Sequence, residues 1–212
     1  LNPAAVVLVA TVRAMKYHGG VNKEDLSKEN PPALDKGLAN LERHFTNIRD
    51  HYGLPCVVSI NHFTADTDAE IKMLQERVQK LGGTAVVARH WADGGKGAEE
   101  LARTVVAMVE KSKSKHKYVY EDDAKLTDKI TAIAPRIYGA GQVTFAEAAR
   151  KQLDEWDKDY GRFPVCMAKT QMSFTADPGV RGAPSGHTLN VREVRLANGA
   201  GFVVAICGDM MT

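Results

Sequence analysis

Short apolar runs alternate with longer amphipathic segments through the first half of the chain. Continuous runs rich in β-branched residues, typical of parallel strands buried on both faces, cover residues 5–12, 56–60 and 84–88. Apolar residues recur at helical spacing after each run, over residues 37–52, 68–81 and 98–111. This alternation predicts an α/β fold in which helices flank a parallel sheet.

Glycine, proline and capping residues predict where these elements begin and end. Residues 13–20, with a Gly-Gly pair, and the polar, proline-containing residues 21–36 are predicted loops. Two capping-box patterns, Thr67-x-x-Glu70 and Thr144-x-x-Glu147, predict helix starts.

The second half has a different pattern and predicts a separate part of the molecule. We expect a helix over residues 126–138 with a kink or late break at Pro135, and a second helix from Thr144 to about residue 160. Strand-like segments cover residues 164–168 and 201–207, and an alternating stretch over residues 188–196 lies between them. The predicted organisation is therefore a parallel α/β part with a strand-end cleft over residues 1–116, and a smaller α+β subdomain over residues 117–212.

Composition narrows the classes of function. A formal net charge of +2 argues against nucleic acid and membrane surfaces as partners. No apolar run is long enough to span a membrane, and the apolar start lacks the basic region of a signal peptide. Three widely spaced cysteines in apolar segments predict small buried thiols in a reducing, cytoplasmic setting.

Two aromatic residues stand just after predicted strands, where parallel sheets bind ligands. Phe63 follows the strand at 56–60, and Trp91 follows the strand at 84–88. Both could be ordinary core residues, but polar neighbours surround them. We expect the two rings, with His18, to line one crevice in which a flat heterocycle stacks between Phe63 and Trp91.

The remaining candidates are polar or glycine residues near the predicted strand ends. The turn Gly94-Gly95-Lys96-Gly97 precedes a helix and suits an anion, although a tight turn with a solvated lysine explains it equally well. Other cleft candidates follow the strands: Asn61, Thr67, His90, Lys169 and Gln171. No histidine pair has metal-ligand spacing, so we predict no metal site.

These segments together resemble the formate–tetrahydrofolate ligase family, also called 10-formyltetrahydrofolate synthetase. In the first half the resemblance rests on Val9-Ala10-Thr11-Val12-Arg13-Ala14, His18-Gly19-Gly20, Ile60-Asn61 with Phe63 and Thr67, and His90-Trp91-Ala92 with Gly94-Gly95-Lys96-Gly97. In the second half it rests on Ile137-Tyr138-Gly139-Ala140, Pro164-Val165-Cys166-Met167-Ala168-Lys169-Thr170, Val191-Arg192-Glu193-Val194-Arg195, Gly199-Ala200-Gly201-Phe202 and Gly208-Asp209.

The resemblance implies a reaction and a set of ligands. In the family, ATP with Mg²⁺ phosphorylates formate, and N10 of tetrahydrofolate attacks the formyl phosphate. The pterin lies between a Phe and a Trp, which match Phe63 and Trp91 by motif. Family membership also implies a cytoplasmic homo-oligomer and allows a monovalent cation.

The chain lacks the P-loop of the family, so it is predicted to be a fragment of a longer polypeptide with no activity of its own. Two other interpretations stay open. The chain could be a free-standing folate-binding module without catalytic activity, or an inert segment that serves assembly.

Overall fold

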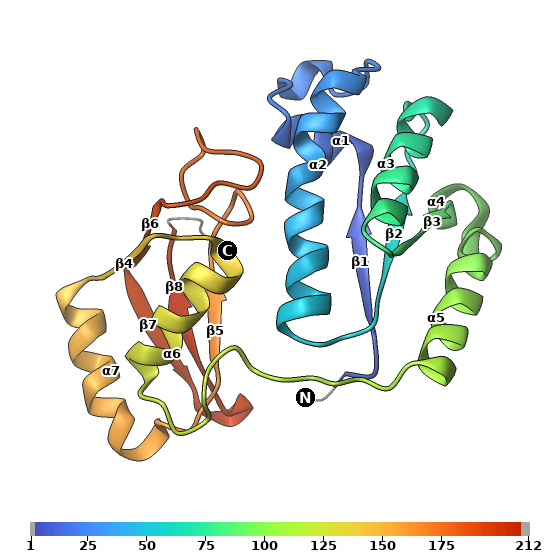
Figure 1. The fold of residues 1–212 in the computed structure, drawn as a ribbon. Helices are drawn as coiled ribbons and strands as arrows, with labels where there is room; N and C mark the ends of the chain where they lie inside the picture. The colour runs from blue at the N-terminus through green and yellow to red at the C-terminus, as the bar shows by residue number, and fades with distance from the viewer. Residues whose placement is uncertain (1–2, 209–212) are drawn as a thin grey trace. The chain divides into compact units, whose positions relative to one another are not determined.

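The computed structural model describes residues 3–208 and divides the chain into two compact units. Unit 1 covers Leu1–Lys117 and unit 2 covers Tyr118–Thr212 (Figure 1). Each unit has its own sheets and its own hydrophobic core. The fold is α/β, as the sequence predicts.

Unit 1 is built on a three-stranded parallel sheet in the order β1-β2-β3. The strands are β1 (Val6–Ala10), β2 (Cys56–Asn61) and β3 (Thr84–Ala88). In register, Ala10 lies beside Ile60 and Asn61 lies beside Ala88, so the three carboxyl ends share one edge of the sheet. The predicted parallel pairing is confirmed.

Helices cover both faces of this sheet. One face packs against α1 (Val12–His18), α2 (Pro31–Thr46) and α3 (Asp68–Lys80), and its core includes Val58 and Ile60. The other face carries α5 (Glu99–Lys111), which contacts β2 and β3. On that face Val57 and Ser59 are buried, whereas Val9 of the edge strand β1 is 61% exposed.

The two loops predicted between β1 and the helix at residue 37 are largely helical, so that prediction is wrong. Helix α1 begins directly after β1 because the Thr11 hydroxyl caps it, accepting a hydrogen bond from the Ala14 N–H at 3.0 Å. A short 3₁₀ turn, η1 (Lys23–Asp25), follows. Helix α2 then begins at Pro31, where the side chain of Asn30 caps Ala33 and the prolines occupy positions that need no N–H donor.

The other boundaries in unit 1 follow the sequence more closely. Helix α2 continues into a π-turn, η2 (Asn47–His51), and the chain turns at Gly53. Thr67 caps α3 as predicted, because its hydroxyl accepts the Glu70 N–H at 3.3 Å. After β3, the predicted glycine-rich loop forms two short helical turns, α4 (His90–Asp93) and η3 (Gly94–Ala98).

Unit 2 contains two small sheets and two main helices. Strands β4 (Gln142–Phe145) and β6 (Thr188–Val191) pair in parallel. Strand β8 (Phe202–Ile206) lies between β5 (Val165–Ala168), which is parallel to it, and β7 (Glu193–Ala197), which is antiparallel. The 3₁₀ turn η5 (Asn198–Ala200) joins β7 to β8.

The helices of unit 2 are α6 (Leu126–Ile133), which runs into the π-turn η4 (Ala134–Tyr138) containing Pro135, and α7 (Glu147–Tyr160). The predicted start of a helix at Thr144 is wrong. Thr144 lies in β4, where its hydroxyl donates to the Asn190 side chain at 3.2 Å, and α7 begins after Ala146. Pairing with β6 therefore overrides the local capping pattern.

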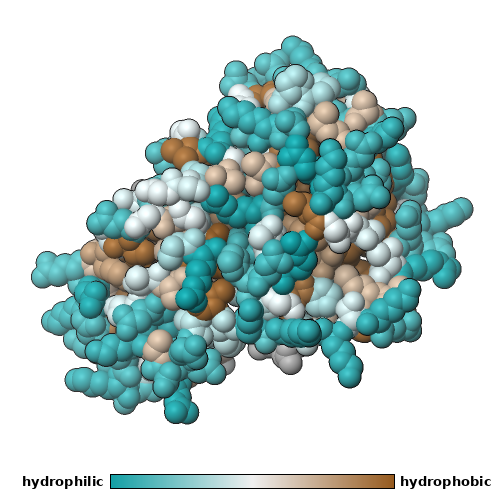
Figure 2. Space-filling model, viewed as in Figure 1, coloured by the Kyte–Doolittle hydropathy of each residue, from teal (hydrophilic) through white to brown (hydrophobic). Residues whose placement is uncertain are grey.

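Surface properties agree only in part with the composition-based predictions. On the face in Figure 2, hydrophilic residues cover most of the surface and apolar patches are small. No helix among residues 3–208 is long and apolar enough to cross a membrane. Burial raises the pKa of the Cys56 thiol to about 11 and that of Cys207 to about 12. Cys166, predicted to be buried, is exposed on the edge strand β5.

Candidate functional site

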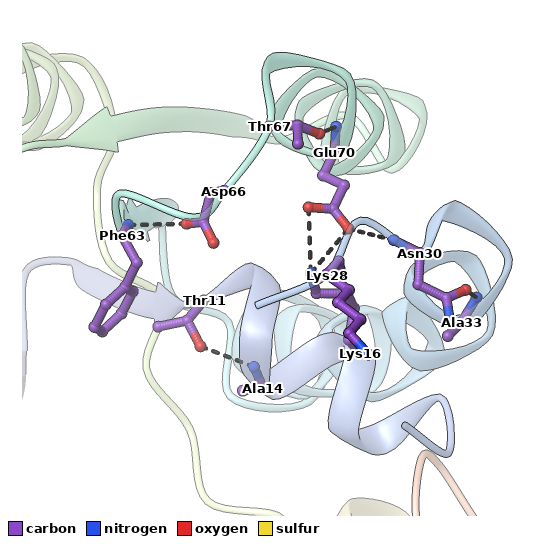
Figure 3. Close-up of polar contacts among 10 residues, drawn as sticks. All are labelled: Thr11, Ala14, Lys16, Lys28, Asn30, Ala33, Phe63, Asp66, Thr67 and Glu70. Atoms are coloured by element: carbon purple, nitrogen blue, oxygen red, sulfur yellow. Dashed lines mark hydrogen bonds and ion pairs between the residues drawn. The ribbon is translucent and has the colours of Figure 1, made fainter. Parts of the chain in front are cut away.

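The first loop, residues 61–67, follows β2 and presents Phe63 from a fixed turn. Asn61 ends the strand, and the Phe63 N–H donates to Asp66 Oδ2 at 2.9 Å (Figure 3). In return, the Asp66 N–H donates to the Phe63 carbonyl oxygen at 2.9 Å. The Asp66 side chain thus closes the turn in the way that aspartate commonly does. Its other oxygen, Oδ1, is buried and has no hydrogen-bond partner among the described residues.

Arg13 reaches the same ring from the first turn of α1. Its guanidinium carbon lies 5.4 Å from the centroid of Phe63, a distance at which a cation is attracted to an aromatic face. Because α1 starts directly after β1, Arg13 stands at the carboxyl end of that strand. His18, which the sequence predicted there, is instead the last residue of α1. That part of the prediction is wrong because a helix replaces the expected loop.

A buried ion pair joins α1 to the first turn of α3, directly after the first loop. Lys16 of α1 and Glu70 of α3 are both fully buried, and Lys16 Nζ lies 3.0 Å from Glu70 Oε1. The ammonium also donates to the Lys28 carbonyl oxygen at 2.8 Å, and Glu70 Oε1 accepts the Asn30 N–H at 2.9 Å (Figure 3). These contacts join α1, which carries Arg13, to the first turn of α3, which follows the loop that carries Phe63.

The second loop, residues 89–98, presents Trp91 very differently. Trp91 lies in α4 and its residue surface is 78% exposed. No ring contact between Phe63 and Trp91 occurs in the described part of the chain. A large aromatic side chain in that setting has apolar surface available for a partner.

Two contacts join the loops at their bases. The His62 N–H donates to the Ala88 carbonyl oxygen at 3.1 Å, which continues the β2–β3 ladder by one bond. Beyond it, Arg89 Nη1 lies 3.2 Å from His62 Nε2. The two loops therefore start side by side.

The glycines of the second loop have separate structural roles. Gly94 has φ 59° and ψ −144°, a conformation that only glycine adopts readily. Gly97 packs against the backbone of Arg89 so closely that a Cβ would lie 2.5 Å from its carbonyl carbon. Gly95 has open space around its Cα. A cavity of about 660 Å³ beside this loop is lined by Val87, Arg89, Asp93, Lys96, Gly97 and Glu100, so both signs of charge meet there.

The remaining candidates lie in different parts of the chain. Thr67 serves as the cap of α3, and His90 is exposed at the first residue of α4. Lys169 and Gln171 belong to unit 2, where they follow β5; Lys169 has a left-handed backbone with φ 67°. Among residues 3–208, no group of three or more His, Cys, Asp or Glu side chains could hold a metal ion.

Sequence reasoning missed Arg13, Lys16 and Asp66. Arg13 and Lys16 are three residues apart on α1, on either side of the buried Met15. Predicting a helix over residues 12–18 would have placed both residues on the helix that follows the first strand. Asp66 carried a turn signal, because it is three residues after Phe63 and directly before the cap.

Comparison with known proteins gives the family. The family model described as formate–tetrahydrofolate ligase matches residues 1–212. Proteins named formate–tetrahydrofolate ligase from Methylococcus capsulatus, Methylibium petroleiphilum and Rhizobium etli are 65%, 58% and 55% identical to the chain. Each match covers 100% of this chain and 38% of the relative, so the chain spans well under half the length of these proteins. The chain belongs to the formate–tetrahydrofolate ligase family.

Proposed function

We propose that this chain is the folate-binding part of an ATP-dependent formate–tetrahydrofolate ligase, in which Phe63 and Trp91 hold the pterin ring. The observation that carries the proposal is the position of the two aromatics at the carboxyl ends of neighbouring parallel strands. Ligands of open α/β sheets bind at that edge. Neighbouring strands are about 5 Å apart, so loops from β2 and β3 can reach opposite faces of one flat ligand.

The proposed roles of the other residues follow from their contacts. Asn61 and Thr67 shape the first loop, since one ends β2 and the other caps α3. Gly94, Gly95 and Gly97 keep the second loop compact and open to a ligand, and His90 stands beside Trp91. Lys169 and Gln171, which follow β5 in unit 2, stay weaker cleft candidates.

In the proposed reaction, formate attacks the γ-phosphorus of ATP and ADP leaves, giving formyl phosphate. N10 of tetrahydrofolate then attacks the formyl carbon, and inorganic phosphate leaves as the N10 proton is lost. Within these 212 residues no segment matches the phosphate-binding pattern Gly-x-x-x-x-Gly-Lys-Ser/Thr. The part played by this chain is therefore to bind and orient the pterin, while ATP and Mg²⁺ bind through other residues of a complete enzyme. The proposal includes a cytoplasmic homo-oligomer and allows a monovalent cation.

A chimaera tests this proposal. The matching 38% of the Methylococcus capsulatus relative is replaced by this chain, and formation of 10-formyltetrahydrofolate from formate and ATP is measured. Phe63→Ala and Trp91→Ala are expected to weaken tetrahydrofolate binding by about 0.5–1.5 kcal/mol each through lost stacking, with a further loss from apolar burial. Trp156→Phe, on α7 of unit 2, is the matched control and is expected to leave folate affinity unchanged.

The same assay on the 212-residue chain separates the enzyme from a binding module. We expect the isolated chain to bind tetrahydrofolate and to form no product. Folate-dependent ADP release by the isolated chain would contradict this assignment. If the chimaera is folded but inactive and the isolated chain binds folate, the result favours the alternative, a folate-binding module without catalytic activity.

A further inference from the structure

A second cavity lies beside α1, away from the second loop. It has a volume of about 330 Å³ and is lined by Arg13, Ala14, Tyr17, Lys23 and Leu26. This volume is at the lower end of the range found for sites that bind small molecules. The lining contains two cations and no carboxylate.

Arg13 connects this cavity to Phe63. The Arg13 side chain lines the cavity, and its guanidinium also lies 5.4 Å from the centroid of the Phe63 ring. A ligand that stacks on Phe63 would therefore lie next to a residue that also lines the cavity.

Contacts of the buried Lys16 hold two walls of the cavity together. Lys16, on the buried side of α1, donates to the Lys28 carbonyl oxygen at 2.8 Å and pairs with Glu70. This fixes the segment that carries Lys23 and Leu26 against α1. The heads of Arg13 and Lys23 remain exposed on these fixed walls.

Lys23 has a charge that no neighbour neutralises by direct contact. Asp25, two residues later, pairs with Lys28 at 2.8 Å. The Lys23 side chain makes no hydrogen bond or ion pair with any residue in the range 3–208. Glu24 is adjacent in sequence and exposed but does not line the cavity.

We propose that this cavity binds the p-aminobenzoyl-glutamate tail of the folate whose pterin stacks on Phe63. Tyr17 and Leu26 supply apolar surface for the benzoyl ring, and Arg13 and Lys23 face the glutamate carboxylates, including those of a polyglutamate extension. This inference rests on the proposed function and adds the site for the acidic half of the substrate.

The test compares three ligands that differ only in the tail. The chimaera described above is titrated with tetrahydropteroate, which has no glutamate, with tetrahydropteroylmonoglutamate and with tetrahydropteroyltriglutamate. Lys23→Gln removes one cation from the cavity, and Lys36→Gln, an exposed lysine on α2 that does not line it, is the matched control. An exposed charge pair changes affinity by roughly two- to fivefold.

The expected result is that Lys23→Gln lowers triglutamate affinity roughly two- to fivefold, lowers monoglutamate affinity less, and leaves tetrahydropteroate affinity unchanged. Added salt is expected to reduce the advantage of the triglutamate in the parent protein and to have less effect on the variant. Lys36→Gln is expected to behave like the parent protein with all three ligands.

Two outcomes overturn the inference. One is an equal effect of Lys23→Gln on all three ligands, or no effect on any. The other is competition by inorganic phosphate with tetrahydropteroate as strongly as with the triglutamate, which would assign the cations to a phosphate group. Phe63→Ala distinguishes these from failure of the proposed function, because it is expected to weaken all three ligands whether or not the tail binds in this cavity.

Discussion

The two loops at the carboxyl ends of β2 and β3 carry one aromatic ring each, but the chain secures them very differently. Phe63 is half-buried on a turn closed by Asp66, with Arg13 over its ring. Trp91 is 78% exposed on a short helical turn. The ends of the second loop are joined by a hydrogen bond from the Arg89 N–H to the Gly97 carbonyl oxygen at 2.9 Å, beside the tight packing of Gly97.

This difference indicates a fixed platform and an exposed partner. Asp66 closes the turn at Phe63, and the buried Lys16–Glu70 pair joins α1, which carries Arg13, to α3 after the loop. We expect Phe63 to be positioned before any ligand binds. Such preorganisation lowers the entropy lost on binding. Trp91 would gain burial only when a ligand covers it, which makes it the better reporter of binding.

The largest expected effect comes from breaking the buried Lys16–Glu70 ion pair. Glu70→Gln leaves the buried Lys16 ammonium without its counter-charge, and removal of one partner of a buried pair typically destabilises a protein by about 3–5 kcal/mol. Urea unfolding of the 212-residue chain measures this loss. A double variant, Lys16→Met with Glu70→Leu, removes both charges and is expected to be more stable than Glu70→Gln. A Glu70→Gln chain as stable as the parent would show that the pair does not anchor the platform.

A second test measures how stability depends on pH through His44, which lies on the same face of the sheet as the Lys16–Glu70 pair. Burial, with smaller contributions from His18 and Arg43, lowers the pKa of His44 on α2 from 6.5 to about 4. Below pH 6.5 the unfolded chain takes up a proton at this position, whereas the folded chain does so only near pH 4. The free energy of unfolding therefore has its full value above pH 6.5. It falls by about 3 kcal/mol as the pH falls towards 4.

The control for that test lies on the second loop. The free energy of unfolding is measured from pH 7.5 to pH 4 for the parent, for His44→Gln and for His90→Gln. His44→Gln is expected to flatten the pH dependence by about 3 kcal/mol, whereas the exposed His90 is expected to change it little. Parallel curves for all three proteins would contradict the assignment to His44.

The compact packing of the second loop can be tested with two glycines two residues apart. Gly97→Ala forces a methyl group onto the Arg89 backbone and is expected to cost about 1–3 kcal/mol. Gly95→Ala has open space and is expected to be neutral or slightly stabilising. Thermal unfolding checks both. Equal behaviour of the two variants would show that Gly97 is not required for the closure of this loop.

The smallest expected effects on stability come from removing the two rings, which tests the difference between the two loops directly. Phe63→Ala is expected to destabilise the chain by about 1–2 kcal/mol, because a half-buried ring loses part of its burial energy. Trp91→Ala is expected to stay within about 0.5 kcal/mol of the parent, since it is a surface substitution. The same unfolding assay serves for both. A larger loss for Trp91→Ala than for Phe63→Ala would reverse the assignment of platform and exposed partner.

The strands and the parallel sheet were predictable because their patterns are local. Runs such as residues 56–60 and 84–88 are mostly apolar. The helices between them require the crossover that makes neighbouring strands parallel. Thr67 was also predictable as a cap. Phe63 and Trp91 could be chosen as candidates from their positions after the strands.

The rest depended on tertiary contacts that no local pattern contains. Helix α1 lies against α2, so residues 13–18 became helical although a Gly-Gly pair follows them. Glu70 matched a capping box, yet its carboxylate binds Lys16 and the Asn30 N–H, 54 and 40 residues away. Thr144 joined a strand because its partner strand β6 comes 46 residues later.

Tryptophan emission tests the central claim, a pterin held between Phe63 and Trp91, most directly. The chain has two tryptophans, so Trp156→Phe leaves Trp91 as the only tryptophan, and excitation near the red edge of its absorption avoids the tyrosines. Titration of this variant with tetrahydrofolate is predicted to quench the emission saturably, and the additional change Phe63→Ala is predicted to shift the curve to higher concentration by roughly two- to tenfold, the equivalent of about 0.5–1.5 kcal/mol. Emission that does not respond to tetrahydrofolate in the folded variant, or an unchanged curve with Phe63→Ala, would contradict it.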